Sequence, residues 1–236
     1  MDDGPLVALA RKGRGGVSRL YFAAKAPIAG QVKTRLGAAI GMQEAATLYE
    51  AFLRDLVSRF RNVPYEIAWH VTPGSWPRLR PLAASAYAVR VQRGRGWAER
   101  QANLFRDCDA AGEGPIVLAA TDSPQLEPAR VDEAFAALES HDVVFGPTLD
   151  GGYYLVGMRR FHDIFSRAHM SRTSTLAELK ERAGNLSLSV IELDLEFDVD
   201  TEEDLDQLMR EVSRRQDLRW TARALGLIRG SGVRVA

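Results

Sequence analysis

Three cationic side chains lie close together in the segment Ala24–Leu36, which has the sequence AKAPIAGQVKTRL. Lys25, Lys33 and Arg35 repel one another unless an anion lies between them. Lysine offers phosphate oxygens a compact charge, and arginine offers them a planar fork of donors. Gly30 lets the backbone bend sharply, so that N–H groups can face an anion. The segment therefore predicts a phosphate-binding loop. The alternative is a solvated basic loop in which each cation pairs with a surface carboxylate.

Carboxylates occur next to predicted strands at two further places. Asp122 lies just after the apolar run PIVLAA, within the motif ATDSP, and Asp198 and Asp200 lie within FDVDTEEDL. Asp122 could cap a helix, and Thr201 with Asp204 resembles a capping box. However, Mg²⁺ is usually held by one or two carboxylates together with substrate phosphates. Asp122 opposite a cationic loop therefore favours a shared divalent ion, with Asp198 or Asp200 as the second carboxylate.

A pair of glycines follows a further carboxylate, Asp150, in the sequence GPTLDGGYYLVG. Gly151 and Gly152 let a ligand approach the backbone closely. A free carboxylate beside them can bind hydroxyl groups or accept a proton. The segment predicts a substrate-binding loop, and the alternative is a plain hairpin turn.

The composition excludes several classes of protein. The chain has 236 residues with 46% hydrophobic content, which predicts a soluble domain with a substantial core. Lys+Arg and Asp+Glu both number 31, whereas a general nucleic-acid binder usually carries a basic excess. Cys108 is the only cysteine, which excludes an internal disulfide and a cysteine-rich metal site. The sequence contains no apolar run of membrane-spanning length and no signal-peptide core after Met1, so we expect a cytoplasmic protein.

Two familiar nucleotide-binding motifs are absent. The Walker pattern G-x-x-x-x-G-K-[ST] does not occur in the sequence. The GRGG run at Gly13–Gly16 precedes the first predicted strand, whereas a dinucleotide fingerprint follows it. A phosphate site in the Lys33 loop would therefore have a different design.

Strand and helix patterns alternate along the chain. We expect strands at 19–24, 65–71, 87–92, 115–120, 143–146, 152–157 and 186–193, and helices at 43–60, 97–110, 128–140, 175–183 and 202–212. This alternation predicts an α/β fold with a single mostly parallel sheet covered by helices. The expected organisation is a loose segment at 1–18, one domain at 19–214, and a basic tail at 215–236 that packs as a last helix or frays. Ligands bind such sheets at the carboxyl ends of the strands, where the Lys33 loop, the Asp122 motif and the segment with Asp198 and Asp200 are expected.

Taken in this order, the motifs AKAPIAGQVKTRL, ATDSP, GPTLDGGYYLVG and DVDTEEDL resemble a known family. It is the bacterial glycosyltransferase A-type family of nucleotide-diphospho-sugar transferase-like proteins, including a branch assigned to arsenosugar biosynthesis. More distantly, the chain is similar to nucleotidyltransferases that make guanylylated phospholactate, molybdenum cofactor dinucleotides and CMP-sugars. The resemblance extends from about Leu20 to Leu208. It departs at Gln92–Gln101, where Trp97 and Ala98 replace a Leu-Gly pair.

The resemblance implies a Rossmann-like nucleotide-diphospho-sugar transferase fold and a Mg²⁺- or Mn²⁺-dependent enzyme. The phosphates would contact Lys25, Pro27, Gly30, Lys33, Arg35 and Thr121. The metal ligands would be Asp122 and Asp200, with Asp198 behind them. The sugar or acceptor would contact Arg100, Asp150, Gly151, Gly152 and Tyr153. The catalytic residues would be Asp150, Asp122 and Lys33.

Three functions fit these residues, each with a nucleotide as ligand. The family and the DGGY loop favour glycosyl transfer from a nucleotide-diphospho-sugar to a small-molecule acceptor. The alternative is nucleotidyl transfer from a nucleoside triphosphate to a phosphorylated small molecule, because three loop cations suit a triphosphate. A catalytically silent nucleotide-binding protein is the third, although the intact carboxylates and cations argue against it. The sequence carries no signal for the base, the acceptor or the oligomeric state.

Overall fold

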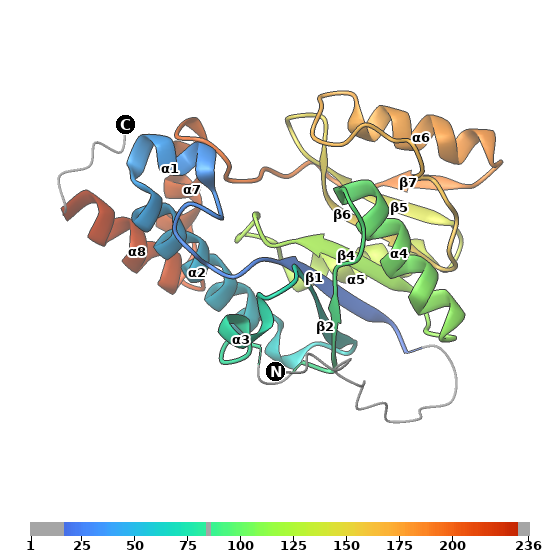
Figure 1. Cartoon of the computed structure of the whole chain (residues 1–236), viewed down its shortest axis with the longest axis horizontal. Helices are drawn as coiled ribbons and strands as arrows, with labels where there is room; N and C mark the ends of the chain where they lie inside the picture. Colours follow the sequence, from blue (N-terminus) through green and yellow to red (C-terminus); the bar gives the residue numbers. More distant parts are fainter. Residues whose placement is uncertain (1–16, 84–85, 231–236) are drawn as a thin grey trace.

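The computed structural model describes residues 17–83 and 86–230, so the GRGG run lies outside the described residues. The strands are β1 (Arg19–Ala24), β2 (Glu66–Val71), β3 (Ala88–Val91), β4 (Ile116–Ala120), β5 (Val143–Pro147), β6 (Tyr153–Met158) and β7 (Val190–Glu192). The helices are α1 (Thr34–Ile40), α2 (Met42–Arg59), α3 (Trp76–Leu79), α4 (Trp97–Ala110), α5 (Pro128–Ala137), α6 (Thr175–Asn185), α7 (Glu203–Arg214) and α8 (Arg219–Gly230), with a 3₁₀ turn η1 at Phe60–Asn62. Figure 1 shows these strands in one sheet with helices packed around it.

The seven strands form a single mostly parallel sheet in the order β3-β2-β1-β4-β6-β5-β7. β1 lies in the middle of the parallel part and pairs with β2 and β4, with Ala23 opposite both His70 and Ala120. Because these strands are parallel, their carboxyl ends lie at the same edge of the sheet. The loops after β1 and β4, which carry the first two motifs, therefore meet there.

β6 runs antiparallel to both of its neighbours, β4 and β5. Because β4 and β5 are both antiparallel to β6, they run in the same direction, and β7 pairs in parallel with β5. The turn from β5 into β6 consequently lies at the edge that holds the ends of β1 and β4. This one reversed strand brings the Asp150 turn to the same edge as Asp122.

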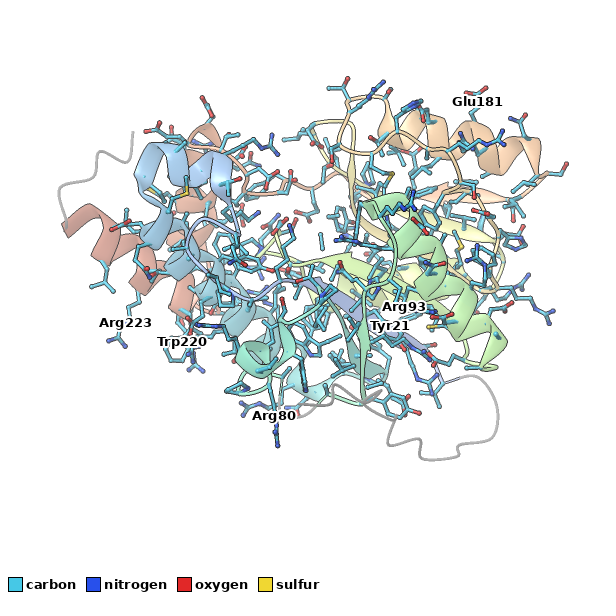
Figure 2. All side chains as sticks on the ribbon, in the orientation of Figure 1. Tyr21, Arg80, Arg93, Glu181, Trp220 and Arg223 are labelled. Carbon is cyan, nitrogen blue, oxygen red and sulfur yellow. The ribbon has the colours of Figure 1, made fainter. Side chains whose placement is uncertain are left out.

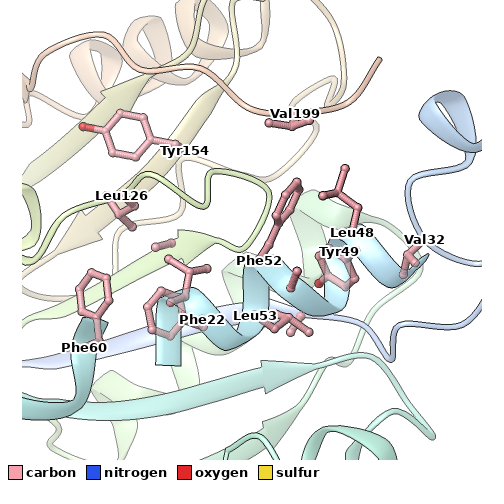
Figure 3. Close-up of a cluster of buried hydrophobic side chains, with 14 of the residues drawn as sticks. Phe22, Val32, Leu48, Tyr49, Phe52, Leu53, Phe60, Leu126, Tyr154 and Val199 are labelled. Atoms are coloured by element: carbon pink, nitrogen blue, oxygen red, sulfur yellow. The ribbon is translucent and has the colours of Figure 1, made fainter. Parts of the chain in front are cut away.

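Helices cover both faces of the sheet, and each face has its own apolar cluster. The larger cluster joins Leu20, Phe22 and Ala24 to residues of α1, α2, α5, α7 and α8. Phe22 contacts Phe60 edge-on, and Figure 3 shows it among the side chains of α2. The smaller cluster joins Tyr21 and other strand residues to α4 and α6. The alternating side chains of β1 therefore face two different helix layers, as expected of a buried central strand.

The segment 215–236, expected as a basic tail, contains helix α8, which packs against α2. Asp55 of α2 is fully buried and accepts hydrogen bonds from the backbone N–H groups of Trp220 (3.1 Å) and Thr221 (2.8 Å). These donors belong to the first turn of α8, which has no partners for them within the helix. Figure 2 shows Trp220 beside α2 and Arg223 pointing to solvent. A carboxylate from the neighbouring helix therefore fixes the start of α8.

Two expectations for local structure differ from what the structure shows. The helix expected at 43–60 is preceded by the separate short helix α1, because Gly41 adopts φ 103° and breaks the helical path between them. The strand expected at 186–193 is reduced to Val190–Glu192, since α6 continues to Asn185 and Ser187 adopts φ 56° in the turn that follows. Within the described residues, no helix is long and apolar enough to cross a membrane.

Candidate functional site

Lys33 is the centre of the candidate site. Its Nζ lies 2.8 Å from Oδ1 of Asp122 and 2.9 Å from Oδ1 of Asp200, and its side chain is only 3% exposed. Burial alone would lower the pKa of Lys33, but the charges of the two carboxylates outweigh it and raise the pKa. The first-loop lysine and the two expected metal ligands are thus brought together at the edge of the sheet.

The backbone of Lys33 adopts a rare conformation. Its φ of 47° and ψ of 43° place it in the left-handed region, immediately before α1. A residue with a side chain costs about 1 kcal/mol or more in this region, and such strain persists only where the surroundings hold it. The buried Lys33 ammonium is anchored by its ion pairs with Asp122 and Asp200, and these contacts hold the residue in this conformation.

The other loop cations point to solvent. Arg35 is 70% exposed and its guanidinium pairs with Oδ2 of Asp200. Burial would raise the pKa of Asp200, but Lys33 and Arg35 lower it. Lys25 and Gly30 are exposed, and Gly30 adopts φ 76° with open space around its Cα. Pro27 is half-buried in the same loop. Incoming phosphates can therefore reach Lys25 and Arg35, which are exposed, whereas the Lys33 ammonium is buried between two carboxylates.

A second carboxylate holds Asp200 in position. Oδ2 of Asp204 accepts hydrogen bonds from the backbone N–H groups of Asp200 and Thr201, both at 2.8 Å, and from the Thr201 hydroxyl at 3.0 Å. The expected capping box is therefore only half formed, because the Thr201 hydroxyl bonds the Asp204 carboxylate. The backbone N–H of Val199 also donates to the carbonyl of Asp122 (3.0 Å), which docks this segment onto the end of β4.

Asp198 adds a further carboxylate to this edge. Burial, reinforced by the neighbouring charges of Asp200 and Asp150, raises its pKa to about 6. Asp122 acts on it in the same direction, while Lys33 opposes the shift. Asp198 therefore lies close enough to interact with the other three acidic side chains of this edge, two of which contact the buried Lys33 ammonium.

The Asp150 turn is tightly built. Oδ1 of Asp150 accepts hydrogen bonds from the Thr148 hydroxyl (2.6 Å) and from the backbone N–H of Gly152 (2.9 Å). Gly151 adopts φ 85°, and a Cβ there would lie 2.0 Å from the carbonyl oxygen of Thr173. Gly151 is therefore required for the turn to pack against the segment before α6. The turn is a structural hairpin that still exposes Asp150 at the edge.

The remaining expected substrate contacts lie near α4. Arg100 donates to the Gln92 side chain (3.3 Å) and to the carbonyl of Gly94 (3.2 Å), at the end of β3. Tyr153 packs its ring on Phe145 and accepts a 2.6 Å hydrogen bond from Gln101, against the smaller apolar cluster. The Tyr153 side chain is therefore partly buried beneath α4, whereas Asp150 in the preceding turn is exposed.

Tyr49 of α2 belongs to the site, although the sequence indicated only that it lies within the helix expected at 43–60. Its hydroxyl lies 2.8 Å from the hydroxyl of Thr121 and 3.3 Å from the backbone N–H of Lys25. Thr121, expected at the phosphates, is itself buried and donates to the carbonyl of Ala23 (2.8 Å). Because Tyr49 and Thr121 are 72 positions apart, no local pattern could reveal the contact.

The donors at this edge fit a divalent ion shared with a nucleotide. Carboxylate oxygens are the ligands that Mg²⁺ and Mn²⁺ prefer, and Asp122 and Asp200 are close enough to contact one Lys33 ammonium. In the described part of the chain, no group of three or more His, Cys, Asp or Glu side chains is arranged to hold an ion. Further ligands would therefore have to come from phosphate oxygens and water.

A cavity of about 490 Å³ lies elsewhere, between α5, α7 and the segment before Asp198. Its charged lining residues are Glu127, Arg130, Glu133, Glu196, Glu211 and Arg215. Arg130 and Arg215 already pair with Glu133 (2.5 Å) and Glu127 (3.0 Å). Because carboxylates outnumber cations here, the cavity repels phosphates. We therefore place a nucleotide at the Lys33 edge and not in this cavity.

Known proteins resemble this chain over most of its length. A family model described as "uncharacterized protein conserved in bacteria (DUF2064)" matches residues 56–172. A 3-phospho-D-glycerate guanylyltransferase from Phenylobacterium zucineum (strain HLK1) is 32% identical over 189 residues, covering 75% of this chain and 84% of the relative. The chain belongs to the DUF2064 family.

Solved structures show the same architecture. The crystal structure of a proposed nucleotide-diphospho-sugar transferase from Desulfovibrio desulfuricans G20 is 28% identical and matches with a TM-score of 0.81, over 92% of this chain and 98% of that chain. A cytidylyltransferase from Leptospira borgpetersenii serovar Hardjo-bovis (strain JB197) is 14% identical with a TM-score of 0.55, over 92% and 96%, which shows the fold alone. These matches confirm the expected fold, and with the guanylyltransferase relative they show that this DUF2064 protein is a transferase.

Proposed function

We propose that the protein is a nucleotidyltransferase that joins a nucleoside triphosphate to a phosphorylated small acid and releases pyrophosphate. The observation that carries the proposal is the gathering of Lys33, Arg35 and Asp122 at one edge, with Asp200 beside them. The similarity to a 3-phospho-D-glycerate guanylyltransferase supports this reading over the glycosyl transfer that the sequence motifs favoured. By that similarity, the proposed donor is GTP and the proposed acceptor is a phosphoglycerate-like acid.

The reaction is a substitution at the α-phosphorus of the triphosphate. An oxygen of the acceptor phosphate forms a bond to the α-phosphorus, and the bond from that phosphorus to the bridging oxygen of the β-phosphate breaks. The electron pair leaves with pyrophosphate. Lys25 and Arg35, which are exposed at the loop, bind the departing phosphates and stabilise their charge.

A divalent ion, when bound, would neutralise charge on the phosphates and help to orient the α-phosphorus for attack. Asp122 and Asp200 are the residues that would hold it. The backbone of each residue is held in place, that of Asp122 by the N–H of Val199 and that of Asp200 by the Asp204 carboxylate. Both side chains therefore start from fixed positions at the edge of the sheet.

The acceptor phosphate is ionised at neutral pH and needs no base to become a nucleophile. In glycosyl transfer, by contrast, an acceptor hydroxyl must lose a proton, and Asp150 is the carboxylate expected to take it. In the proposed reaction Asp150, exposed at the turn between β5 and β6, orients the acceptor instead. The role of this one side chain therefore differs between the two reactions.

The test is an assay of the purified protein with Mg²⁺, each of the four nucleoside triphosphates, and 3-phosphoglycerate. We expect release of pyrophosphate that depends on the acceptor, and a new pyrophosphate linkage in the ³¹P spectrum of the product. Asp122→Asn should remove the activity, while Asp132→Asn, an exposed change on α5, should keep it. Turnover of nucleotide-sugars without pyrophosphate release from any triphosphate would establish glycosyl transfer. Nucleotide binding without either reaction would establish a silent nucleotide-binding protein.

A further inference from the structure

Tyr49 lies at the junction of α2, β1 and β4, where the first two motifs meet. Its side chain is 3% exposed, and that of Thr121 is 2% exposed, so neither hydroxyl has ready access to water. The Tyr49 oxygen lies 3.3 Å from the backbone nitrogen of Lys25 and 2.8 Å from the Thr121 oxygen. Figure 3 shows Tyr49 on α2 beside Leu48 and Phe52, in the buried layer under the loop.

The direction of each hydrogen bond follows from the partners. The Lys25 N–H can only donate, so the Tyr49 oxygen accepts from it. Thr121 donates its hydroxyl proton to the carbonyl of Ala23 (2.8 Å), so it accepts from the Tyr49 hydroxyl. The hydrogen bonds therefore run from the Lys25 N–H to Tyr49, from Tyr49 to Thr121, and from Thr121 to the carbonyl of Ala23. Together with the backbone from Ala23 to Lys25, they form a closed ring that joins the end of β1 to the end of β4.

This ring connects the two parts of the site that must keep a fixed spacing. Lys25 begins the loop that carries Lys33 and Arg35, and Thr121 immediately precedes Asp122. The next residue of the loop, Ala26, is held from the other side by the Ser75 hydroxyl (2.9 Å). We propose that Tyr49 is a positioning residue that holds the phosphate loop at its distance from Asp122. The inference rests on the proposed function for its catalytic meaning, but the positioning itself can be measured without any nucleotide.

The change Tyr49→Phe removes the hydroxyl and keeps the ring that fills the core. The matched control is Tyr154→Phe, because Tyr154 is also buried (1% exposed) and donates its hydroxyl to a backbone carbonyl, that of Asp194 (3.2 Å). Hydrogen exchange in the nucleotide-free proteins gives the first readout. We expect amides of residues 25–33 to exchange about tenfold faster in Tyr49→Phe and at the wild-type rate in Tyr154→Phe.

Thr121 provides a second test of the same ring. Thr121→Val removes the acceptor of the Tyr49 proton, so hydrogen exchange at the same amides should become faster. In the double variant with Tyr49→Phe, exchange should be little faster than in either single variant. Thr121→Ser keeps a hydroxyl and should keep the slow exchange. Additive effects of the two changes, or unchanged exchange in Tyr49→Phe, would overturn the positioning role.

Nucleotide binding and turnover give the functional readout. In Tyr49→Phe we expect the Kd for GTP with Mg²⁺ to rise about two- to tenfold, and kcat to fall more than in Tyr154→Phe, as for the loss of one buried hydrogen bond. Equal losses of melting temperature in both variants, with equal Kd and kcat, would show a merely structural hydroxyl and overturn the inference. A wild type that binds no triphosphate would refute the proposed function, while the exchange experiment would still decide whether Tyr49 holds the loop.

Discussion

At the scale of single residues, the Lys33 ammonium lies between the two carboxylates that we propose as ligands of a divalent ion. Its Nζ lies within 2.9 Å of an oxygen of each, and it is buried. An ammonium and a metal ion cannot both fit between the same two oxygens. We propose that an ion bound at these two oxygens displaces Lys33, and that the phosphates of a nucleotide are the partner to which the ammonium turns. Metal and nucleotide are expected to bind together.

Lys33→Met should expose this competition. In the absence of nucleotide, we expect the variant to bind Mn²⁺ about tenfold more tightly than the wild type, because a positive charge that contacts both carboxylates is removed. Calorimetric titration or the electron paramagnetic resonance signal of free Mn²⁺ measures this affinity. The two carboxylates lose their partner, so the variant should melt at a lower temperature and recover when Mn²⁺ is added. Weaker Mn²⁺ binding by Lys33→Met would contradict the competition.

Arg35→Ala should weaken nucleotide binding and leave the fold intact, because the side chain is 70% exposed. Loss of an arginine–phosphate contact costs about 1.5–3 kcal/mol, or about one to two decades in affinity. The control is Arg106→Ala, a half-exposed arginine of α4 that contacts Asp163 and the ring of Phe161. Equal GTP affinity in the wild type and in Arg35→Ala would remove Arg35 from the phosphate site.

Asp150→Asn separates the two candidate reactions. The amide still accepts a hydrogen bond through its oxygen, so the turn formed with Thr148 and Gly152 should be kept. If the acceptor is an ionised phosphate, turnover should stay within about fivefold of the wild type, because no proton has to be taken. A loss of about two decades, with unchanged nucleotide affinity, would instead indicate a general base and favour glycosyl transfer.

At the scale of elements, the sequence patterns located most of the strands and helices to within a few residues. The expected helix at 97–110 is α4 (Trp97–Ala110), and the expected strand at 115–120 contains β4 (Ile116–Ala120). Periodicity works there because one face of α4 is apolar and β4 is apolar throughout. It did not reveal α1, whose seven residues are too few to show a repeat.

Helix α8 depends on a long-range contact, and Asp55→Ala tests it. The buried Asp55 carboxylate accepts both N–H bonds at the start of α8, from Trp220 and Thr221. Loss of such a cap costs about 1–2 kcal/mol of unfolding free energy, and the two donors left in a buried position add to this. Urea unfolding measures the change. Asp132→Ala, an exposed carboxylate on α5, should have no comparable effect. A stability equal to that of the wild type would show that α8 does not need the cap.

At the scale of the whole molecule, the topology explains which parts of the site were predictable. The rule that ligands bind at the carboxyl ends of parallel strands is enough to bring the Lys33 loop and Asp122 together. Asp150 lies at the same edge because β6 runs antiparallel to β4, and the sequence does not indicate this direction. The ion pairs of Lys33 and the hydroxyl of Tyr49 could not be predicted, since their partners are contributed by distant segments.

The buried His70 of β2 couples the stability of the whole fold to pH. The residue is 2% exposed, and its Nδ1 has no hydrogen-bond partner among the described residues. Burial, reinforced by the charges of Arg100 and Arg90, lowers its pKa from 6.5 to about 3. Between these two values the unfolded chain binds a proton at this position and the folded chain does not. Stability must therefore fall as the pH drops below 6.5, and the loss stops growing near pH 3.

We predict that His70 lowers the free energy of unfolding by about 2 kcal/mol between pH 7.5 and pH 5, because pH 5 lies 1.5 units below its pKa of 6.5 in the unfolded chain. Asp198 has the opposite effect on stability as the pH falls. Its pKa is raised to about 6 in the folded chain, so the folded chain binds a proton there at a higher pH than the unfolded chain does. The difference between the wild type and His70→Gln isolates the histidine, since Asp198 is present in both. Urea unfolding at intervals from pH 7.5 to pH 5 should give curves that converge or cross as the pH falls. His162→Gln, at a half-exposed position, should run parallel to the wild type. If the stability of His70→Gln also runs parallel to that of the wild type across this pH range, His70 binds a proton in the folded protein as readily as in the unfolded chain, and the prediction is wrong.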